Sequence, residues 1–140
     1  MLFLESLSGH TIVCGYGIVG QHIVEILAEH GLRFVIVESN HDTAEHAREK
    51  GYSVIEGDAT TSHALKNAEI ASARAIAIAM DNDAKNLFTV LTARDLNKSI
   101  FIATRASDNL VREKMLEAGA DYIVMPQNSA SDEILSELTK

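Results

Sequence analysis

Cysteine, proline and tryptophan are almost absent from this chain. Its 140 residues include one Cys, one Pro and no Trp. The single thiol, Cys14, forms no intrachain disulfide, and zinc sites that need paired thiolates are excluded. A chain with 46% hydrophobic residues and so little proline is unlike a disordered or loop-rich protein. The composition therefore predicts one compact, regular domain in a reducing compartment.

Basic residues and long apolar runs are also scarce. Lys and Arg number 12 against 20 Asp and Glu, and the formal net charge of -8 repels nucleic acid and anionic lipid. No segment reaches the roughly 18 to 20 apolar residues that cross a bilayer, and residues 1–5 lack the basic region of a targeting signal. We therefore expect no nucleic-acid partner and no direct membrane insertion. Residues 1–9 are expected to be an N-terminal tail or linker stub, and residues 10–140 the domain.

Short apolar runs alternate with segments of helical period along the whole chain. Six runs predict strands, at Thr11–Cys14, Phe34–Val37, Ser53–Glu56, Ala75–Met80, Ile100–Thr104 and Tyr122–Met125. Most are continuously apolar, which is typical of parallel strands covered on both faces. Helices are predicted around Val19–Leu27 and over Asp42–Lys50, Ser62–Ala68, Ala84–Leu96 and Asp108–Ala118, with Gly31, Gly51 and Gly119 at helix ends.

This alternation predicts an α/β fold of the Rossmann type, with a doubly wound parallel six-stranded sheet in a single domain. Right-handed crossovers favour the strand order 3-2-1-4-5-6, which places a ligand crevice between the ends of strands one and four. Residues 127–140 predict a last helix with Ile134, Leu135 and Leu138 on its apolar side. That side is expected to pack either on its own domain or on another chain.

A glycine-rich turn directly follows the first strand. Gly15, Gly17 and Gly20 form a G-x-G-x-x-G pattern and open an amphipathic helix, so they suit a tight turn, close approach of phosphate and helix packing, in that order. Backbone amides at the start of this helix then face an anion. A turn with only a structural role is the alternative.

Glu38 stands at the end of the second strand, 18 residues after Gly20. A carboxylate there can accept hydrogen bonds from both hydroxyls of an adenosine ribose, and it disfavours a 2′-phosphate. NAD or an adenine nucleotide therefore ranks above NADP as the cofactor. A solvated charge at a strand end is the alternative. Residues 39–42 are expected to cap the next helix.

Two further strands end at the same edge of the predicted sheet. Asp58 follows the third strand and can reach an adenine amino group, whereas Thr60 or Thr61 would cap the next helix. Asp81 and Asp83 follow the fourth strand, and for Asp83 helix capping is favoured over ligand contact.

Arg105 follows the fifth strand and is expected to be the only strongly basic residue at this edge. It is either a phosphate partner or a member of a surface ion pair. Cys14 is expected to be a small buried hydrophobe rather than a redox thiol, and the six histidines are expected to lie on the surface. No catalytic residue and no metal site is predicted. The predicted cofactor-binding residues are Gly15, Tyr16, Gly17, Ile18, Val19, Gly20, Glu38, Ser39, Asp58, Ala59, Met80 and Arg105.

Several motifs occur in a fixed order over about residues 10–138. They are Ile12–Gly20, Glu38, Gly57–Thr60, Asn82–Leu87 and Gly119–Pro126. Together they resemble the regulator of potassium conductance family, and unrelated dinucleotide folds rarely combine them. The resemblance implies a cytoplasmic regulatory domain at the inner face of the cell membrane, which binds a nucleotide or ion and controls a potassium channel or a potassium transporter. It also implies a homodimer or a higher ring assembly.

The resemblance assigns Gly15, Gly17 and Gly20 to phosphates, Glu38 to ribose, Asp58 to adenine and Arg105 to a phosphate, for NAD(H), ATP, ADP or AMP as ligand. Calcium-gated members carry carboxylates just after the fifth strand. Here Arg105, Ala106 and Ser107 stand there, which argues against such a calcium site. The second lobe that often follows this domain is missing, so the chain is expected to be a fragment or a shorter member.

An enzyme is the alternative to a sensor. A dehydrogenase needs a further segment for substrate and for an acid or base, and 140 residues in a six-stranded sheet leave none. The Tyr-x-x-x-Lys pair of single-domain reductases is also absent, because Gly20, Glu56 and Pro126 stand four residues after the three tyrosines. We therefore expect no enzymatic activity, with a small NAD-dependent oxidoreductase, or its cofactor-binding fragment, as the alternative. A methyltransferase is also possible, although the sequence suggests no acceptor site.

Overall fold

Every predicted strand and helix is present in the structure, a computed structural model that describes residues 7–140. The strands are β1 (Thr11–Cys14), β2 (Phe34–Glu38), β3 (Val54–Glu56), β4 (Ala75–Ile78), β5 (Phe101–Arg105) and β6 (Tyr122–Val124). The helices are α1 (Ile18–Glu29), α2 (His41–Glu49), α3 (Ser62–Asn67), α4 (Asp83–Leu96), α5 (Asn109–Ala118) and α6 (Pro126–Leu138). A short 3-10 helix, η2 (Ile70–Ser72), was not predicted. The first six residues of the expected tail lie outside the described part of the chain.

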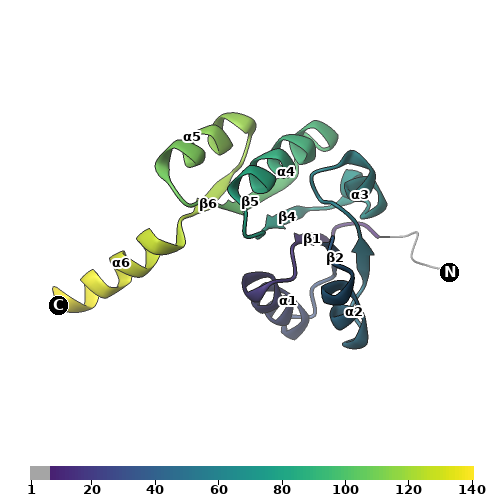
Figure 1. The fold of residues 1–140 in the computed structure, drawn as a ribbon, viewed down its shortest axis with the longest axis horizontal. Helices are drawn as coiled ribbons and strands as arrows, with labels where there is room; N and C mark the ends of the chain where they lie inside the picture. The colour runs from purple at the N-terminus through teal and green to yellow at the C-terminus, as the bar shows by residue number, and fades with distance from the viewer. Residues whose placement is uncertain (1–6) are drawn as a thin grey trace.

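All six strands are parallel and form one sheet in the order β3-β2-β1-β4-β5-β6. The predicted fold and strand order are therefore confirmed. Thr11 at the start of β1 pairs with Phe34 of β2 on one side and with Ala75 of β4 on the other. β1 thus lies at the point where the chain switches from one half of the sheet to the other (Figure 1). All strands end at the same edge of the sheet, called here the carboxyl edge.

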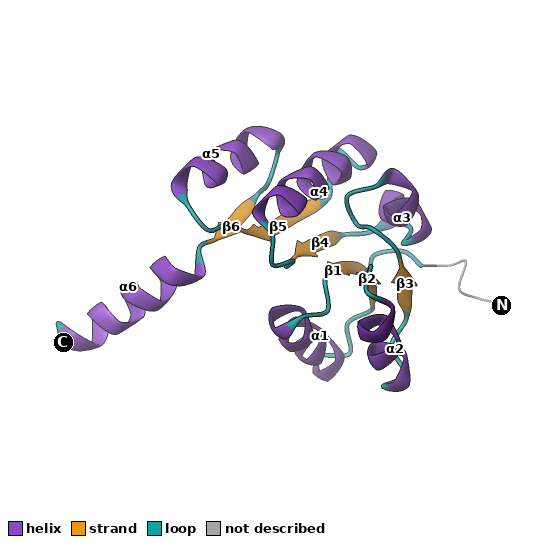
Figure 2. Ribbon diagram, viewed as in Figure 1, coloured by secondary structure: helices purple, strands orange, loops and turns teal. Residues whose placement is uncertain are grey.

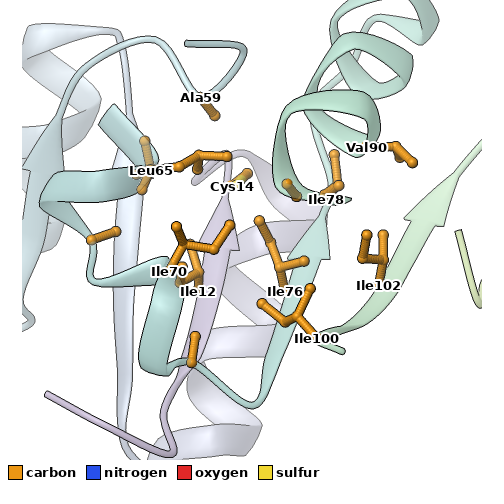
Figure 3. Close-up of a cluster of buried hydrophobic side chains, with 14 of the residues drawn as sticks. Ile12, Cys14, Ala59, Leu65, Ile70, Ile76, Ile78, Val90, Ile100 and Ile102 are labelled. Carbon is orange, nitrogen blue, oxygen red and sulfur yellow. The ribbon is translucent and has the colours of Figure 1, made fainter. Parts of the chain in front are cut away.

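Helices cover both faces of the sheet, with α1 and α2 on one face and α3, α4 and α5 on the other (Figure 2). Side chains alternate between the two faces along a strand. Ile12 and Cys14 accordingly join the larger core cluster beneath α3, α4 and α5, whereas Val13 joins the smaller cluster beneath α1 and α2. Figure 3 shows the larger cluster, where Cys14 lies among isoleucines of the central strands. Cys14 is fully buried, as predicted.

Local signals set most of the helix ends. Gly51 follows α2 and Gly119 follows α5 with φ angles of 88° and 109°, a left-handed conformation that favours glycine. Thr61 caps α3 through its side chain, as one of the two predicted alternatives. The expected capping role of Asp83 is wrong. Asn82 caps α4 instead, because its side-chain oxygen accepts a hydrogen bond from the Lys85 amide at 2.9 Å.

The last helix, α6, extends from the β6 edge away from the rest of the domain (Figure 1). None of its residues is buried, and Ile134, Leu135 and Leu138 are 61%, 57% and 76% exposed. Packing of this apolar side on its own domain, one of the two expected outcomes, is therefore wrong. Within residues 7–140, no helix is long and apolar enough to span a membrane.

Candidate nucleotide-binding site

The carboxyl ends of the strands surround an open cleft of about 1120 Å³. The cleft lies beside the switch point at β1, the place where doubly wound sheets bind ligands. Every predicted binding residue lines it except Gly20. It is also lined by Gln21, Val37, Asp42, Thr43, His46, Gly57, Ala79, Asp81, Asn82 and Lys85. Because pockets for small molecules usually measure about 300–1,000 Å³, the cleft has room for a nucleotide.

The three glycines of the turn have different surroundings. Gly15 has a φ of 97°, and a Cβ there would lie 3.0 Å from Cγ of Met80. A Cβ on Gly20 would overlap the carbonyl oxygen of Gly15, so α1 packs directly on the turn. A Cβ on Gly17 would meet nothing within 4 Å, which leaves open space above the start of α1. The order of roles, tight turn, open approach and helix packing, is the one expected from the spacing.

No side chain of α1 or of its N-cap occupies the place where an anion would bind at the amino end of this helix. Gly17 is its N-cap and supplies no side-chain hydrogen bond, and the first turn contains no acidic residue. Ile18 and Val19 are exposed at the cleft. The first amides of a helix carry partial positive charge and lack intrahelical acceptors. This end of α1 is therefore a ready site for a phosphate group.

The carboxylate of Glu38 is fixed beside the glycine turn. Its Oε1 accepts a hydrogen bond from the Tyr16 amide at 2.7 Å, and its Oε2 accepts one from the Asn40 amide at 2.9 Å. An ionised carboxylate offers about four acceptor positions, so two remain for hydroxyl donors. The pair of bonds holds this acceptor at a set position at the end of β2, close to the amino end of α1.

Two of the predicted binding residues have side chains that face the core. The Tyr16 ring is 1% exposed and packs with Val13, Val24 and Ile36 in the smaller cluster. Ala59 is 3% exposed and belongs to the larger cluster. Both residues can therefore reach a ligand chiefly through their backbone. Ser39, in contrast, is exposed at the cleft.

Asp58 presents an ionised acceptor at the end of β3. Its Oδ1 accepts hydrogen bonds from the Thr60 amide at 2.9 Å and from the Thr60 hydroxyl at 2.7 Å. These bonds, the backbone one first, hold the pKa of the Asp58 carboxyl below its usual value, and the charge of Lys85 acts in the same direction. Asp58 is thus charged at neutral pH and accepts hydrogen bonds, as recognition of an amino group requires.

The opposite wall of the cleft comes from the ends of β4 and β5. Asn86 is buried there, accepts a hydrogen bond from the Met80 amide at 3.2 Å, and donates to the carbonyls of Met80 at 2.9 Å and Arg105 at 3.4 Å. Within residues 7–140 the Arg105 guanidinium makes no ion pair, so the surface ion pair considered for it is absent. Arg105 therefore offers an unpaired cation to the cleft.

Two expectations about charged residues are corrected by the structure. Arg105 is not the only basic residue at this edge, because Lys85 also lines the cleft. Its signal was available in the sequence, since Lys85 stands in the first turn of the helix after the fourth strand. The histidines are not all on the surface, because His10 is fully buried. The residue lies at the amino edge of the sheet, opposite to the cleft.

A second group of potential ligand atoms lies outside the cleft, on α2 and β3. His41, Glu45 and Glu56 place one atom each within 4.8 Å of one another. The guanidinium of Arg48 bonds to both carboxylates, at 3.3 Å for Glu56. A cation already satisfies these carboxylates, so we assign no metal to this group.

Comparison with known protein families identifies the family of this fold. A family model described as the TrkA-N domain matches residues 11–126, which include all six strands. The chain belongs to the TrkA-N domain family. This membership confirms the resemblance to regulators of potassium conductance, since the matched region contains the glycine turn, Glu38 and the Gly57–Thr60 segment.

Curated relatives of this TrkA-N domain are longer than the chain. It is 37% identical over 125 residues to potassium channel protein 1 of Methanocaldococcus jannaschii, covering 88% of the chain and 38% of that protein. It is 30% identical over 135 residues to a Trk system potassium uptake protein TrkA homolog of Pyrococcus horikoshii, covering 92% of the chain and 59% of that protein. The chain thus spans less than two thirds of either relative.

Solved structures of similar domains share the fold. The TrkA-N domain of the inner membrane protein YbaL from Escherichia coli superposes with a TM-score of 0.91 at 25% identity, covering 95% of this chain and 98% of that one. The GsuK channel bound to NAD gives 0.79 at 28% identity, with 87% and 22% covered. The Kef C-terminal domain of Shewanella denitrificans in its AMP-bound form gives 0.77 at 25% identity, with 94% and 82% covered.

Proposed function

We propose that this chain is a regulatory domain that binds NAD(H) or an adenine nucleotide in the cleft and thereby biases the gating of a potassium channel or transporter. The observation that carries the proposal is the fixed Glu38 carboxylate beside the open amino end of α1. A nucleotide needs an acceptor for its ribose hydroxyls next to donors for its phosphate, and this site places them side by side. The NAD and AMP in the names of two similar structures support it.

The remaining cleft residues take the other parts of such a ligand. Asp58 accepts from the adenine amino group, and Arg105 binds a phosphate oxygen by a charge-assisted hydrogen bond. The negative charge of Glu38 repels a 2′-phosphate, so NADP binds more weakly than NAD. The backbones of Tyr16 and Ala59 border the ligand.

Regulation follows if two conformations of the assembly bind the ligand with different affinity. Moving an equilibrium from 1:99 to 99:1 requires about a 10⁴-fold difference in affinity between them. The partner in this proposal is a membrane subunit of a potassium channel or transporter, at the inner face of the cell membrane. The domain acts in the cytoplasm, as a homodimer or in a larger ring. Potassium channel and potassium uptake proteins among the relatives support this partner.

Calorimetric titration with NAD, NADH, ATP, ADP, AMP and NADP tests the proposal. We expect at least one of the first five to bind and NADP to bind more weakly than NAD. Absence of binding by all of the first five contradicts nucleotide sensing. Hydride transfer from NADH to carbonyl substrates, measured on the same protein, would instead support the oxidoreductase alternative.

Substitution of Glu38 tests the ribose contact. We expect Glu38→Ala and Glu38→Gln to weaken binding of the best nucleotide at least tenfold, because a hydrogen bond to a charged group contributes about 1.5–3 kcal/mol and about 1.4 kcal/mol is a factor of ten. Glu38→Gln keeps the size of the side chain and an acceptor for the Tyr16 amide. Glu29→Ala, an equal change of charge at the far end of α1, serves as the control. An unchanged affinity in both Glu38 variants rules out the assignment.

A further inference from the structure

The amino edge of the sheet contains a buried histidine that the proposed function does not use. His10 precedes β1, is fully buried, and donates a hydrogen bond from Nε2 to the carbonyl oxygen of Ala68 at 2.8 Å. Its other ring nitrogen, Nδ1, has no hydrogen-bond partner within residues 7–140. A buried polar atom without a partner lowers stability, whereas an apolar side chain would fill this volume without that loss. Packing alone therefore does not account for a histidine here.

The residues before β1 are also held by η2. The Gly9 amide donates to the Ser72 carbonyl at 2.8 Å, and the Ser72 hydroxyl donates to the Leu7 carbonyl at 2.8 Å. Leu7 packs against the larger core cluster. Residues 7–10 are called here the entry segment. Together with the bond from His10 to Ala68, the C-cap of α3, these two bonds to Ser72 tie the entry segment to α3 and η2 at three places.

Helix α3, which leads into η2, begins beside the nucleotide cleft. Thr61 caps α3, and its hydroxyl donates to the Asp58 carbonyl at 2.7 Å. The Thr60 carbonyl accepts a hydrogen bond from Thr92 of α4 at 2.9 Å. α3 has 6 residues and spans about 9 Å, so one short helix joins the Asp58 loop to Ala68 at the other edge of the sheet.

We propose that α3 and η2, residues 61–73, transmit nucleotide binding from the cleft to the entry segment, and that the bond between His10 and Ala68 is the output contact. This inference rests on the proposed function. Oδ1 of Asp58 accepts both hydrogen bonds from Thr60, the residue before the N-cap of α3, so a ligand amino group that shifts this carboxylate also shifts the start of α3. Leu65 and Ile70 are both buried in the larger core cluster, so packed side chains as well as the chain itself link α3 to η2. Ala68 then moves relative to His10.

Two sites are coupled through a physical element only if that element has two arrangements that both sites bias. In this proposal α3 and η2 are that element, because they are hydrogen-bonded to the entry segment at one end and to the Asp58 loop at the other. By thermodynamic linkage, a change at the entry segment also alters nucleotide affinity by the same factor. The entry segment is therefore the place where ligand occupancy is passed on or received.

Amide hydrogen exchange of the chain with ADP and with NAD tests the proposal. In the wild type we expect the ligand to change exchange at least fivefold in residues 57–61 and also in residues 7–12, where the Gly9 amide reports the contact with Ser72. In His10→Leu the change persists in residues 57–61 and disappears in residues 7–12. Ser72→Ala, an exposed change that removes one anchor, reduces the change in residues 7–12 and stands in for His10→Leu if that variant does not fold.

Two matched variants separate coupling from general loosening. His10→Gln retains a donor for the Ala68 carbonyl and restores the ligand effect on residues 7–12. Arg33→Ala removes the 3.4 Å hydrogen bond from the Arg33 guanidinium to the Ser8 carbonyl, a contact of the entry segment that does not involve α3 or η2. This variant is expected to leave the ligand effect in place. A ligand effect confined to residues 57–61 in the wild type overturns the inference, as does one that persists at residues 7–12 in both His10→Leu and Ser72→Ala. If neither ligand changes exchange anywhere and titration shows no binding, the proposed function fails instead.

Discussion

Gly17 and Gly20 belong to one turn but differ in what a methyl group would meet at each position. At Gly20 it would overlap the Gly15 carbonyl, and at Gly17 it would enter open space at the cleft. We expect Gly20→Ala to lower the midpoint of thermal unfolding by several degrees or to prevent folding, because overpacking costs about 1–3 kcal/mol. Gly17→Ala keeps the φ of -79° that alanine readily adopts, so its unfolding midpoint stays near that of the wild type.

Nucleotide titration completes this comparison. The methyl group of Gly17→Ala stands where the phosphate approaches α1, so we expect at least tenfold weaker binding by a fully folded variant. Gly31→Ala, at a turn on the far side of the domain with φ of 68°, is a control for strain without contact to the cleft. If a folded Gly17→Ala variant binds nucleotide as tightly as the wild type, the assignment of the glycine turn to phosphate binding is wrong.

Among the elements, α2 and β3 are joined by charged side chains near the cleft. His41 at the start of α2 lies 3.0 Å from Glu56 at the end of β3, and Arg48 lies 3.3 Å from the same carboxylate. The hydrogen bond that the His41 ring donates to Glu56 raises the pKa of His41 above 6.5, and the same bond lowers the pKa of Glu56 below 4.5. The folded chain therefore favours the charged form of both groups.

The direction of the pH dependence follows from these shifts. The contribution of His41 is fully present below pH 6.5 and is lost as the pH rises through its raised pKa. The contribution of Glu56 is present above pH 4.5 and is lost as the pH falls through its lowered pKa. The pair therefore stabilises the fold most between these two values.

Thermal unfolding of His41→Ala tests this pair. We expect a small drop of the unfolding midpoint at pH 5.5 that vanishes by pH 9, small because both groups are exposed to solvent. The exposed His63, whose ring faces Asn67 rather than a carboxylate, provides the control variant His63→Ala. An equal effect of His41→Ala at both pH values would show that the pair contributes no charge-dependent stability.

At the scale of the whole molecule, α6 is the helix whose apolar side does not pack on the rest of the domain. Its apolar side carries Ile134, Leu135 and Leu138, all more than half exposed. We expect the chain to form dimers in which this side packs against a second copy. Ile134→Glu combined with Leu138→Glu should shift the molar mass in light scattering after size-exclusion chromatography from dimer to monomer. Ser136→Glu, on the opposite side of α6, should not, and a monomeric wild type would refute the expectation.

The architecture was predictable because its signals are local. Continuously apolar runs indicated parallel strands, and Gly51 and Gly119 ended helices at the left-handed positions that favour glycine. Right-handed crossovers then fixed the strand order, because few other topologies remain. The strand ends converge on one edge, so all the predicted binding residues except Gly20 were brought together around one cleft.

Other features of the site required the tertiary structure. The position of Lys85 after the fourth strand could be read from the sequence, but its approach to Asp58 depends on how α4 packs beside the β3 loop. The capping of α4 was assigned to Asp83 rather than Asn82, since adjacent polar residues serve equally well in sequence and differ only in backbone angles. The hydrogen bonds that Glu38 accepts from the Tyr16 and Asn40 amides could not be predicted from residue spacing either.

The sequence by itself determined the Rossmann-type fold, the glycine turn and the acidic end of β2, because periodicity, chain reversals and residue spacing act over short distances along the chain. Only the tertiary structure decided that His10 is buried against Ala68 and that the apolar side of α6 lies open. Both depend on contacts between segments far apart in sequence, or on their absence. Burial of a polar ring and exposure of apolar side chains each run against the preference of the residue type, so packing decided them.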